Sequence, residues 1–221
     1  MGGIEIVTTG PELLQNDQCR AILVLRLGAA LNSVCAAQRW TNKNQDEGPA
    51  GDFDRIQAFL VAAAHLAEAC KLFRANQGCI LELARKGKAE DDKITKLISI
   101  ADPKTGVQAN LLKRIRDKAT FHWDSEVFEG WASAQKGKVV WLRSSGDTAG
   151  EYVMSASHEA VCDFTADFNA DARKSVQDKI YEQVDDVLDA MTHVIHVFES
   201  AVVGFLDEHG AQHETEGGDL P

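Results

Sequence analysis

The sequence predicts a mostly α-helical protein, an up-and-down helical bundle that carries a small inserted β-hairpin. Apolar residues recur at helical spacing over three long stretches, near residues 17–40, 52–75 and 172–209. The helical pattern fails in residues 124–156, which instead hold two β-favouring runs. Long amphipathic helices of this kind bury their apolar faces against one another around a single core.

The first predicted helix runs from about Asp17 to Trp40. Its apolar residues recur every three or four positions: Ile22, Leu23, Leu25, Leu27, Ala30, Leu31 and Val34. A polar segment rich in Asn and Gly, residues 41–51, cannot continue this pattern and ends the helix. Asp52 is a suitable N-cap for the second helix, which we expect to reach about Ala75.

Three shorter helices are predicted next. The first covers residues 78–85 and stops at Gly87. The second begins at Asp91 and ends before Pro103, because a proline disfavours the helical conformation of the residue that precedes it. The third begins near Val107 and ends near Phe121, so it carries the most basic part of the chain.

The hairpin is predicted from two short runs of β-branched and aromatic residues. These runs are Lys138–Arg143 and Glu151–Met154, and the residues between them, 144–150, are turn-forming. The last predicted helix, residues 172–209, is long enough to cross the bundle. We therefore expect one domain over residues 1–209, with the hairpin insertion at about 124–156, and a disordered tail over residues 210–221.

The charge balance limits what this protein binds. A formal net charge of −11 disfavours general binding to duplex nucleic acid or to a membrane surface. It leaves room for a local cationic site, and four cations fall within six residues: Lys113, Arg114, Arg116 and Lys118.

The location expected for this chain is the cytoplasm. The longest apolar run, residues 21–31, is interrupted by Arg26 and is shorter than the roughly 18 to 20 residues that span a bilayer. The first residues also lack a basic region followed by an apolar one. No membrane segment is therefore predicted.

No metal or cofactor is predicted. Five cysteines lack the spacing of a zinc site, so buried, reduced thiols are favoured: Cys19, Cys35, Cys70, Cys79 and Cys162. Acids and histidines repeat at helical spacing in residues 185–196 and at His65 and Glu68, but without the repeated Glu-x-x-His of di-iron bundles. A metal-binding bundle is therefore the weakest of three readings.

The most informative pattern lies at the end of the third short helix. Arg116 is followed by Asp117, and His122 comes after five intervening residues. A histidine that titrates near neutral pH exchanges protons with a ribose hydroxyl, and an arginine fork stabilises a negative phosphorane. These residue types together favour phosphodiester chemistry, with Lys113, Arg114 and Lys118 as the RNA-binding cations.

The pattern resembles the HEPN superfamily, whose motif is an Arg, a polar residue, and a His after four to six intervening residues. The resemblance covers about a dozen residues. Within the superfamily, these residues are most similar to the form of the motif seen in abortive-infection proteins. It implies an up-and-down helical homodimer with two motifs in one cleft, where active members cleave single-stranded RNA without a metal. It also implies Arg116 and His122 as catalytic residues, Asp117 as their orienter, and an antitoxin or another regulatory partner.

Helix geometry limits how these residues act together. At about 100° per residue, positions six apart on a straight helix point about 120° away from each other. Arg116 and His122 therefore meet only across a helix end or across a dimer interface. The competing reading is a non-catalytic helical protein that binds a partner or assembles. In that protein Arg116 forms an ion pair and His122 lies at a helix C-terminus.

Overall fold

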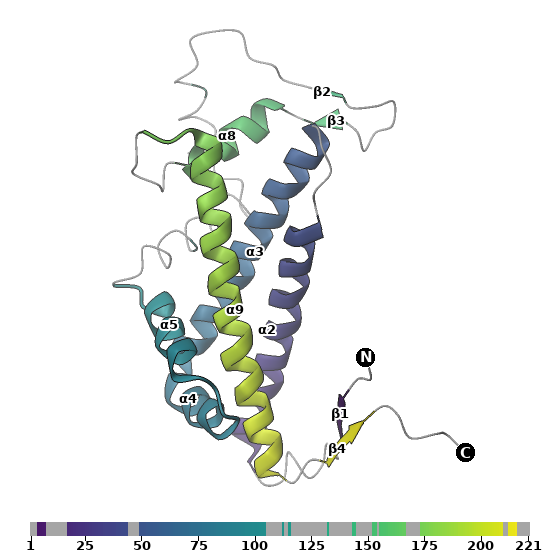
Figure 1. Cartoon of the computed structure of the whole chain (residues 1–221), viewed down its shortest axis with the longest axis vertical. Coiled ribbons are helices and arrows are strands. Elements are labelled where there is room, and N and C mark those ends of the chain that lie inside the picture. The colour runs from purple at the N-terminus through teal and green to yellow at the C-terminus, as the bar shows by residue number, and fades with distance from the viewer. Residues whose placement is uncertain are drawn as a thin grey trace, which may run out of the picture.

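The computed structural model describes residues 4–7, 17–43, 49–104, 112, 115, 132, 143–144, 152–153, 155–166, 173–209 and 212–215. Within these residues the protein is mostly helical, as predicted. Three long helices form the bundle: α2 (Gln18–Lys43), α3 (Pro49–Ala75) and α9 (Val176–Glu208). They run alongside one another over most of their length (Figure 1).

Shorter helices complete the described bundle. Helices α4 (Gln77–Lys86) and α5 (Asp91–Ala101) pack against α9 beside its C-terminal half (Figure 1). Helix α8 (Ser155–Ala166) also contacts α9. Because α9 contacts α2, α3, α4, α5 and α8, it is the element that joins the described parts of the fold.

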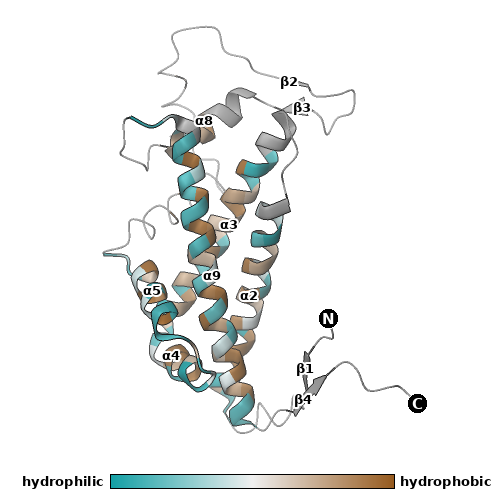
Figure 2. Ribbon diagram, in the orientation of Figure 1, coloured by the Kyte–Doolittle hydropathy of each residue, from teal (hydrophilic) through white to brown (hydrophobic). Residues whose placement is uncertain are grey.

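The core is continuous and aromatic at its centre. The largest fully buried side chains include Phe59 and Phe73 from α3 and Phe198 and Phe205 from α9. Hydrophilic and hydrophobic residues alternate along α9 (Figure 2), as expected for a helix that buries one face. Helix α3 is instead buried around most of its circumference, since the consecutive residues Ala62, Ala63 and Ala64 are all buried. Burial of these side chains stabilises the bundle by roughly 1.5 to 3 kcal/mol each relative to exposure.

Sequence periodicity located most of these helices to within a few residues. The predicted helices near residues 17–40, 52–75, 78–85, 91–100 and 172–209 correspond to α2, α3, α4, α5 and α9. Helix α8 was not predicted, although Ala156, Ala160 and Phe164 recur at helical spacing within it. Of the predicted helix near residues 107–121, the structure describes only Leu112 and Ile115.

Two short antiparallel strand pairs accompany the helices. Strand β2 (Arg143–Ser144) pairs with β3 (Tyr152–Val153), and the rest of the predicted hairpin lies outside the described residues. Strand β1 (Ile4–Val7) pairs with β4 (Gln212–Thr215). Strand β4 lies inside the segment 210–221 that the sequence predicts as a disordered tail. Its partner lies at the other end of the sequence, so local composition gave no sign of the pairing.

Three helices are long and apolar enough to cross a membrane, judged by length and composition alone. Within the described part of the chain they lie at Gln18–Thr41, Asp54–Ala75 and Asp178–Glu208. The sequence criterion used above counted uninterrupted apolar runs, so it passed over windows that tolerate a few charges. The share of each apolar stretch that is buried inside the bundle ranges from 33% for the first helix to 67% for the second.

Candidate functional site

The residues of the predicted RNA site lie outside the part of the chain that the structure describes. They are Lys113, Arg114, Arg116, Asp117, Lys118 and His122. Two residues next to them are described: Leu112 is 2% exposed and Ile115 is fully buried, and both belong to the main apolar core. The segment that leads into the motif is therefore anchored in the bundle by its apolar side chains.

Ile115, which directly precedes Arg116 in the sequence, differs in conformation from Leu112. Leu112 is α-helical, whereas Ile115 is in a π-helical conformation. A π turn is wider than an α turn, so it changes which later residues share a face with earlier ones, and such turns are frequent at functional sites.

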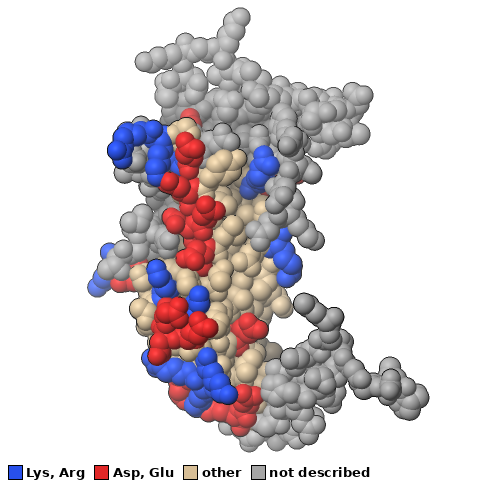
Figure 3. Space-filling view, viewed as in Figure 1, with Lys and Arg blue, Asp and Glu red and all other residues tan. Residues whose placement is uncertain are grey.

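An acidic stripe runs along the N-terminal half of α9. Its members are Glu182, Asp185, Asp186 and Asp189, and Figure 3 shows acidic side chains following this helix. Burial raises the pKa of Asp186, and repulsion from Glu182, Asp189 and Asp185 raises it further. This stripe repels phosphate groups, so it does not serve as a surface for RNA.

A compact ion-pair network joins the N-terminal end of α2, helix α4 and the C-terminal end of α9. Arg20 on α2 lies 3.2 Å from Glu82 on α4 and 3.3 Å from Glu208 on α9. Lys86 contacts the same two carboxylates. The hydrogen bond and the positive charge of Lys86 lower the pKa of the Glu82 carboxyl group. In turn, hydrogen bonds to Glu208 and Glu82 raise the pKa of the Lys86 amine. These cations are already neutralised by acids, so the network connects helices and offers no cation for a phosphate.

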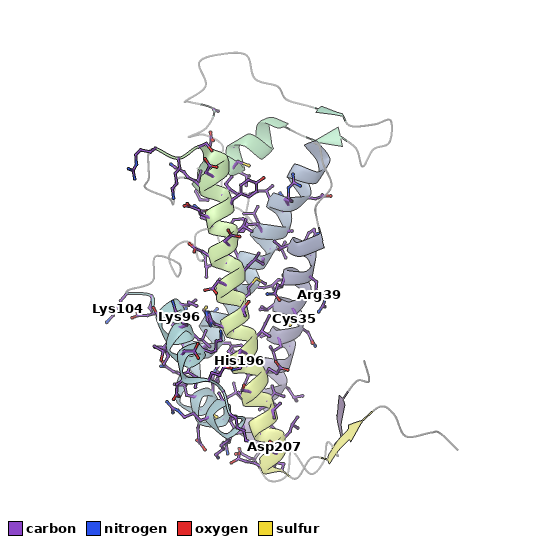
Figure 4. The ribbon with its side chains drawn as sticks, in the orientation of Figure 1. Cys35, Arg39, Lys96, Lys104, His196 and Asp207 are labelled. Atoms are coloured by element: carbon purple, nitrogen blue, oxygen red, sulfur yellow. The ribbon has the colours of Figure 1, made fainter. Side chains whose placement is uncertain are left out.

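The histidines of α9 are held by protein groups. His193 is 6% exposed, and its Nε2 lies 3.4 Å from the carboxylate of Asp189. His196, labelled in Figure 4, accepts a hydrogen bond of 3.3 Å from the backbone N–H of Glu90. Among the described residues, no group of three or more His, Cys, Asp or Glu side chains is arranged to hold a metal ion.

A surface trough between α2 and α3 was not predicted from the sequence. It consists of two hollows of about 390 and 330 Å³, which share Ser33 and His65. Its α3 wall contributes Val61, His65, Glu68, Ala69 and Leu72. Sequence reasoning considered His65 and Glu68 only as metal ligands. The relative placement of two helices, which creates the trough, leaves no sign in the periodicity of either one.

Comparison with family models, with curated proteins and with solved structures finds no match to this chain.

Proposed function

We propose that this protein is a HEPN-like, RNA-directed endonuclease that acts without a metal. The observation that carries the proposal is the motif itself, Arg116 and Asp117 followed by His122. It follows directly after Ile115, which is fully buried in the core. A site needs this kind of rigid support, because catalytic side chains must be held within about 0.5 Å of the productive geometry.

The proposed reaction is an internal transesterification of RNA. The ribose 2′-oxygen attacks the adjacent phosphorus while the bond from phosphorus to the 5′-oxygen breaks. His122 takes the proton of the 2′-hydroxyl or delivers one to the leaving 5′-oxygen, and Arg116 stabilises the negative phosphorane. Asp117 orients one of these two side chains. The products are a 2′,3′-cyclic phosphate and a 5′-hydroxyl.

The proposal includes a homodimer in the cytoplasm. Two copies would place both motifs in one cleft, so that His122 of one copy acts with Arg116 of the other. Lys113, Arg114 and Lys118 would concentrate positive potential there, in a chain whose net charge of −11 otherwise repels RNA. A nuclease of this kind requires restraint in its own cell, so the proposal extends to a toxin or defence role with an antitoxin or another regulatory partner.

The test is cleavage of single-stranded RNA by the purified chain in the presence of EDTA. The variants are Arg116→Ala and His122→Ala. The matched control is Arg85→Ala, which removes an exposed cation of α4 that has no proposed role. We expect each motif variant to lower the cleavage rate by at least about 100-fold, the usual loss for a general acid–base group or an oxyanion donor. The control should keep the wild-type rate.

Two outcomes separate the alternatives. Products that end in a 2′,3′-cyclic phosphate, lost in both motif variants, support the nuclease. Absence of cleavage by the wild-type chain, together with motif variants that mainly lower the melting temperature, rejects it.

The non-catalytic alternative, a helical protein that binds a partner, is favoured by one separate observation, the open trough between α2 and α3.

A further inference from the structure

Helix α2 differs in charge from the rest of the chain. The chain as a whole has 34 acidic and 23 basic residues. Within Gln18–Lys43, however, there is no acidic residue and there are four basic ones: Arg20, Arg26, Arg39 and Lys43. Arg20 is neutralised by Glu82 and Glu208, so the positive charge that the described side chains of α2 present to a partner rests on Arg26 and Arg39.

The solvent face of α2 is also unusual, because its centre carries no charge. The exposed residues at its centre recur every three or four positions: Gln18, Ile22, Leu25, Ala29, Asn32, Ala36 and Trp40. Ile22 is 46% exposed, Leu25 68% and Trp40 41%. A surface helix normally places charged residues at the centre of its solvent face. The spacing observed here is instead that of a seam onto which another helix packs.

Two arginines flank this exposed seam on opposite sides. On an ideal helix Arg26 lies on one side of the seam and Arg39 on the other, and both are exposed. Figure 4 shows Arg39 projecting from α2 at the edge of the bundle. Neither arginine forms an ion pair with any residue that the structure describes. Within the described part of the chain, therefore, no acid neutralises these two charges.

The trough extends this surface onto α3. Its α2 wall includes Arg26, Ala29, Asn32, Ala36 and Trp40, which are the same residues as the seam and its flank. On the α3 side, Glu68 is offset by Lys71, whose Nζ lies 3.8 Å away. The seam and the trough thus form one mainly apolar surface that includes Asn32, Ser33 and His65. Its positive charges are those of Arg26 and Arg39 on the two sides of the seam.

From this arrangement we propose that the seam and trough of α2 and α3 bind an amphipathic helix of a partner protein whose apolar seam is flanked by acidic residues. Helix-in-groove recognition uses apolar anchors at helical spacing, and flanking charges set the choice of partner. Ala29, Asn32 and Ala36 are small enough to let a second helix approach closely. The acidic flanks would pair with Arg26 and Arg39 across the interface.

The two other occupants fit this surface less well. Pairing of α2 with α2 of a second copy would bring basic helices together, and like charges disfavour that contact. An anionic lipid surface would also satisfy the arginines, and the exposed Ile22, Leu25 and Trp40 would insert into it. The seam would insert Asn32 together with them, however. A buried Asn side chain without a partner opposes insertion into hydrocarbon. A partner helix can pack closely against the small residues and pair its acidic side chains with the two arginines.

The experiment uses a designed probe with the full chain. The probe is a fluorescein-labelled helical peptide with Leu and Ala along a heptad seam and Glu at both flanks. A second peptide has the same seam and Lys at the flanks. Binding is measured by fluorescence anisotropy at moderate salt. We expect the Glu peptide to bind at least tenfold more tightly than the Lys peptide.

The decisive variant reverses both arginines, Arg26→Glu with Arg39→Glu. We expect it to bind the Glu peptide at least tenfold more weakly than the wild-type chain and to prefer the Lys peptide. Leu25→Glu should weaken the binding of both peptides. Arg85→Glu, a charge reversal on α4, is the matched control and should leave binding of the Glu peptide unchanged. All the substituted residues are exposed, so we expect each variant to fold. Circular dichroism checks that each variant keeps the helicity of the wild-type chain.

Three results would overturn the proposal. The first is Glu-peptide binding that the double reversal leaves unchanged. The second is tighter binding of the chain to phosphatidylglycerol vesicles than to the Glu peptide, with loss of vesicle binding in the Leu25→Glu variant. The third is sedimentation as a dimer that Leu25→Glu dissociates. None of these measurements depends on RNA cleavage, so they test this surface independently of the proposed nuclease.

Discussion

Gly87 at the end of α4 and Gly204 on α9 meet backbone to backbone. A Cβ atom added to Gly87 would lie 1.9 Å from the carbonyl oxygen of Ser200. One added to Gly204 would lie 2.2 Å from the carbonyl oxygen of Leu83 and 2.6 Å from the backbone nitrogen of Gly87. No side chain larger than hydrogen fits at either position without movement of a helix. This contact sets how closely α4 approaches α9.

We expect Gly204→Ala to lower the free energy of unfolding by about 3 kcal/mol, because the new methyl group forces apart backbone atoms that have no side-chain freedom to yield. Urea denaturation followed by circular dichroism measures the change. Gly28→Ala on α2 is the matched control, since a Cβ there meets nothing within 4 Å. The control should stabilise the protein by about 0.5 to 1 kcal/mol through helix propensity. Equal effects of the two substitutions would contradict the close approach.

Lys88 has the conformation that favours glycine. Its φ is 62°, in the left-handed region, and it follows the last residues of α4. A side chain in this region costs about 1 kcal/mol or more relative to glycine. Lys88→Gly should therefore raise the free energy of unfolding by about 1 kcal/mol, measured by urea denaturation. Lys88→Ala should give no such gain, because alanine keeps the Cβ atom, and a gain from alanine would point to the lysine charge instead.

The acidic stripe predicts a pH-dependent gain from Asp186→Asn. Burial and neighbouring carboxylates raise the pKa of Asp186 above its ordinary value of 3.8. The folded protein therefore binds this proton more tightly, so the ionised group costs stability at neutral pH and the cost disappears as pH falls below the ordinary value. Solvent screening keeps the effect small. We expect a melting temperature about 1 °C higher at pH 7.

The control for Asp186→Asn is the same comparison near pH 3. Wild-type and variant chains should then melt at the same temperature, because the carboxyl group is protonated in both the folded and the unfolded states. A gain of equal size at both pH values would mean that the substitution acts through packing and not through charge.

Cys70 should resist alkylation in the folded protein. It is 2% exposed, and burial raises the pKa of its thiol to about 12, although the charge of Arg74 opposes the shift. At pH 8 its thiolate fraction is roughly a thousandfold smaller than that of an ordinary thiol. Cys19 is exposed. Treatment with iodoacetamide followed by mass spectrometry of peptides should label Cys19 at once, and Cys70 only in guanidinium chloride. Labelling of both at similar rates in the native state would contradict the burial.

Much of the fold follows from local patterns. The bounds of α2, α3, α4, α5 and α9 follow from apolar spacing and from breakers such as Pro103, because helix formation depends on neighbours three and four residues away. Helix α8 was not predicted, because no element was assigned to residues 157–171. The pairing of β1 with β4 joins residues about 200 positions apart, and no local pattern reports a contact of that kind.

The candidate sites divide in the same way. The sequence alone reveals the Arg116–His122 motif, since a motif is a matter of residue type and spacing. It also determined the basic character of α2 and the exclusion of broad polyanion binding by the net charge of −11. The three-dimensional packing was needed to show that Leu112 and Ile115 are buried in the core, that Gly87 and Gly204 touch, and that α2 and α3 leave a trough between them. The physical reason is that spacing fixes which face of a helix is apolar. Which helix covers that face, and how closely, depends on the packing of all the helices together.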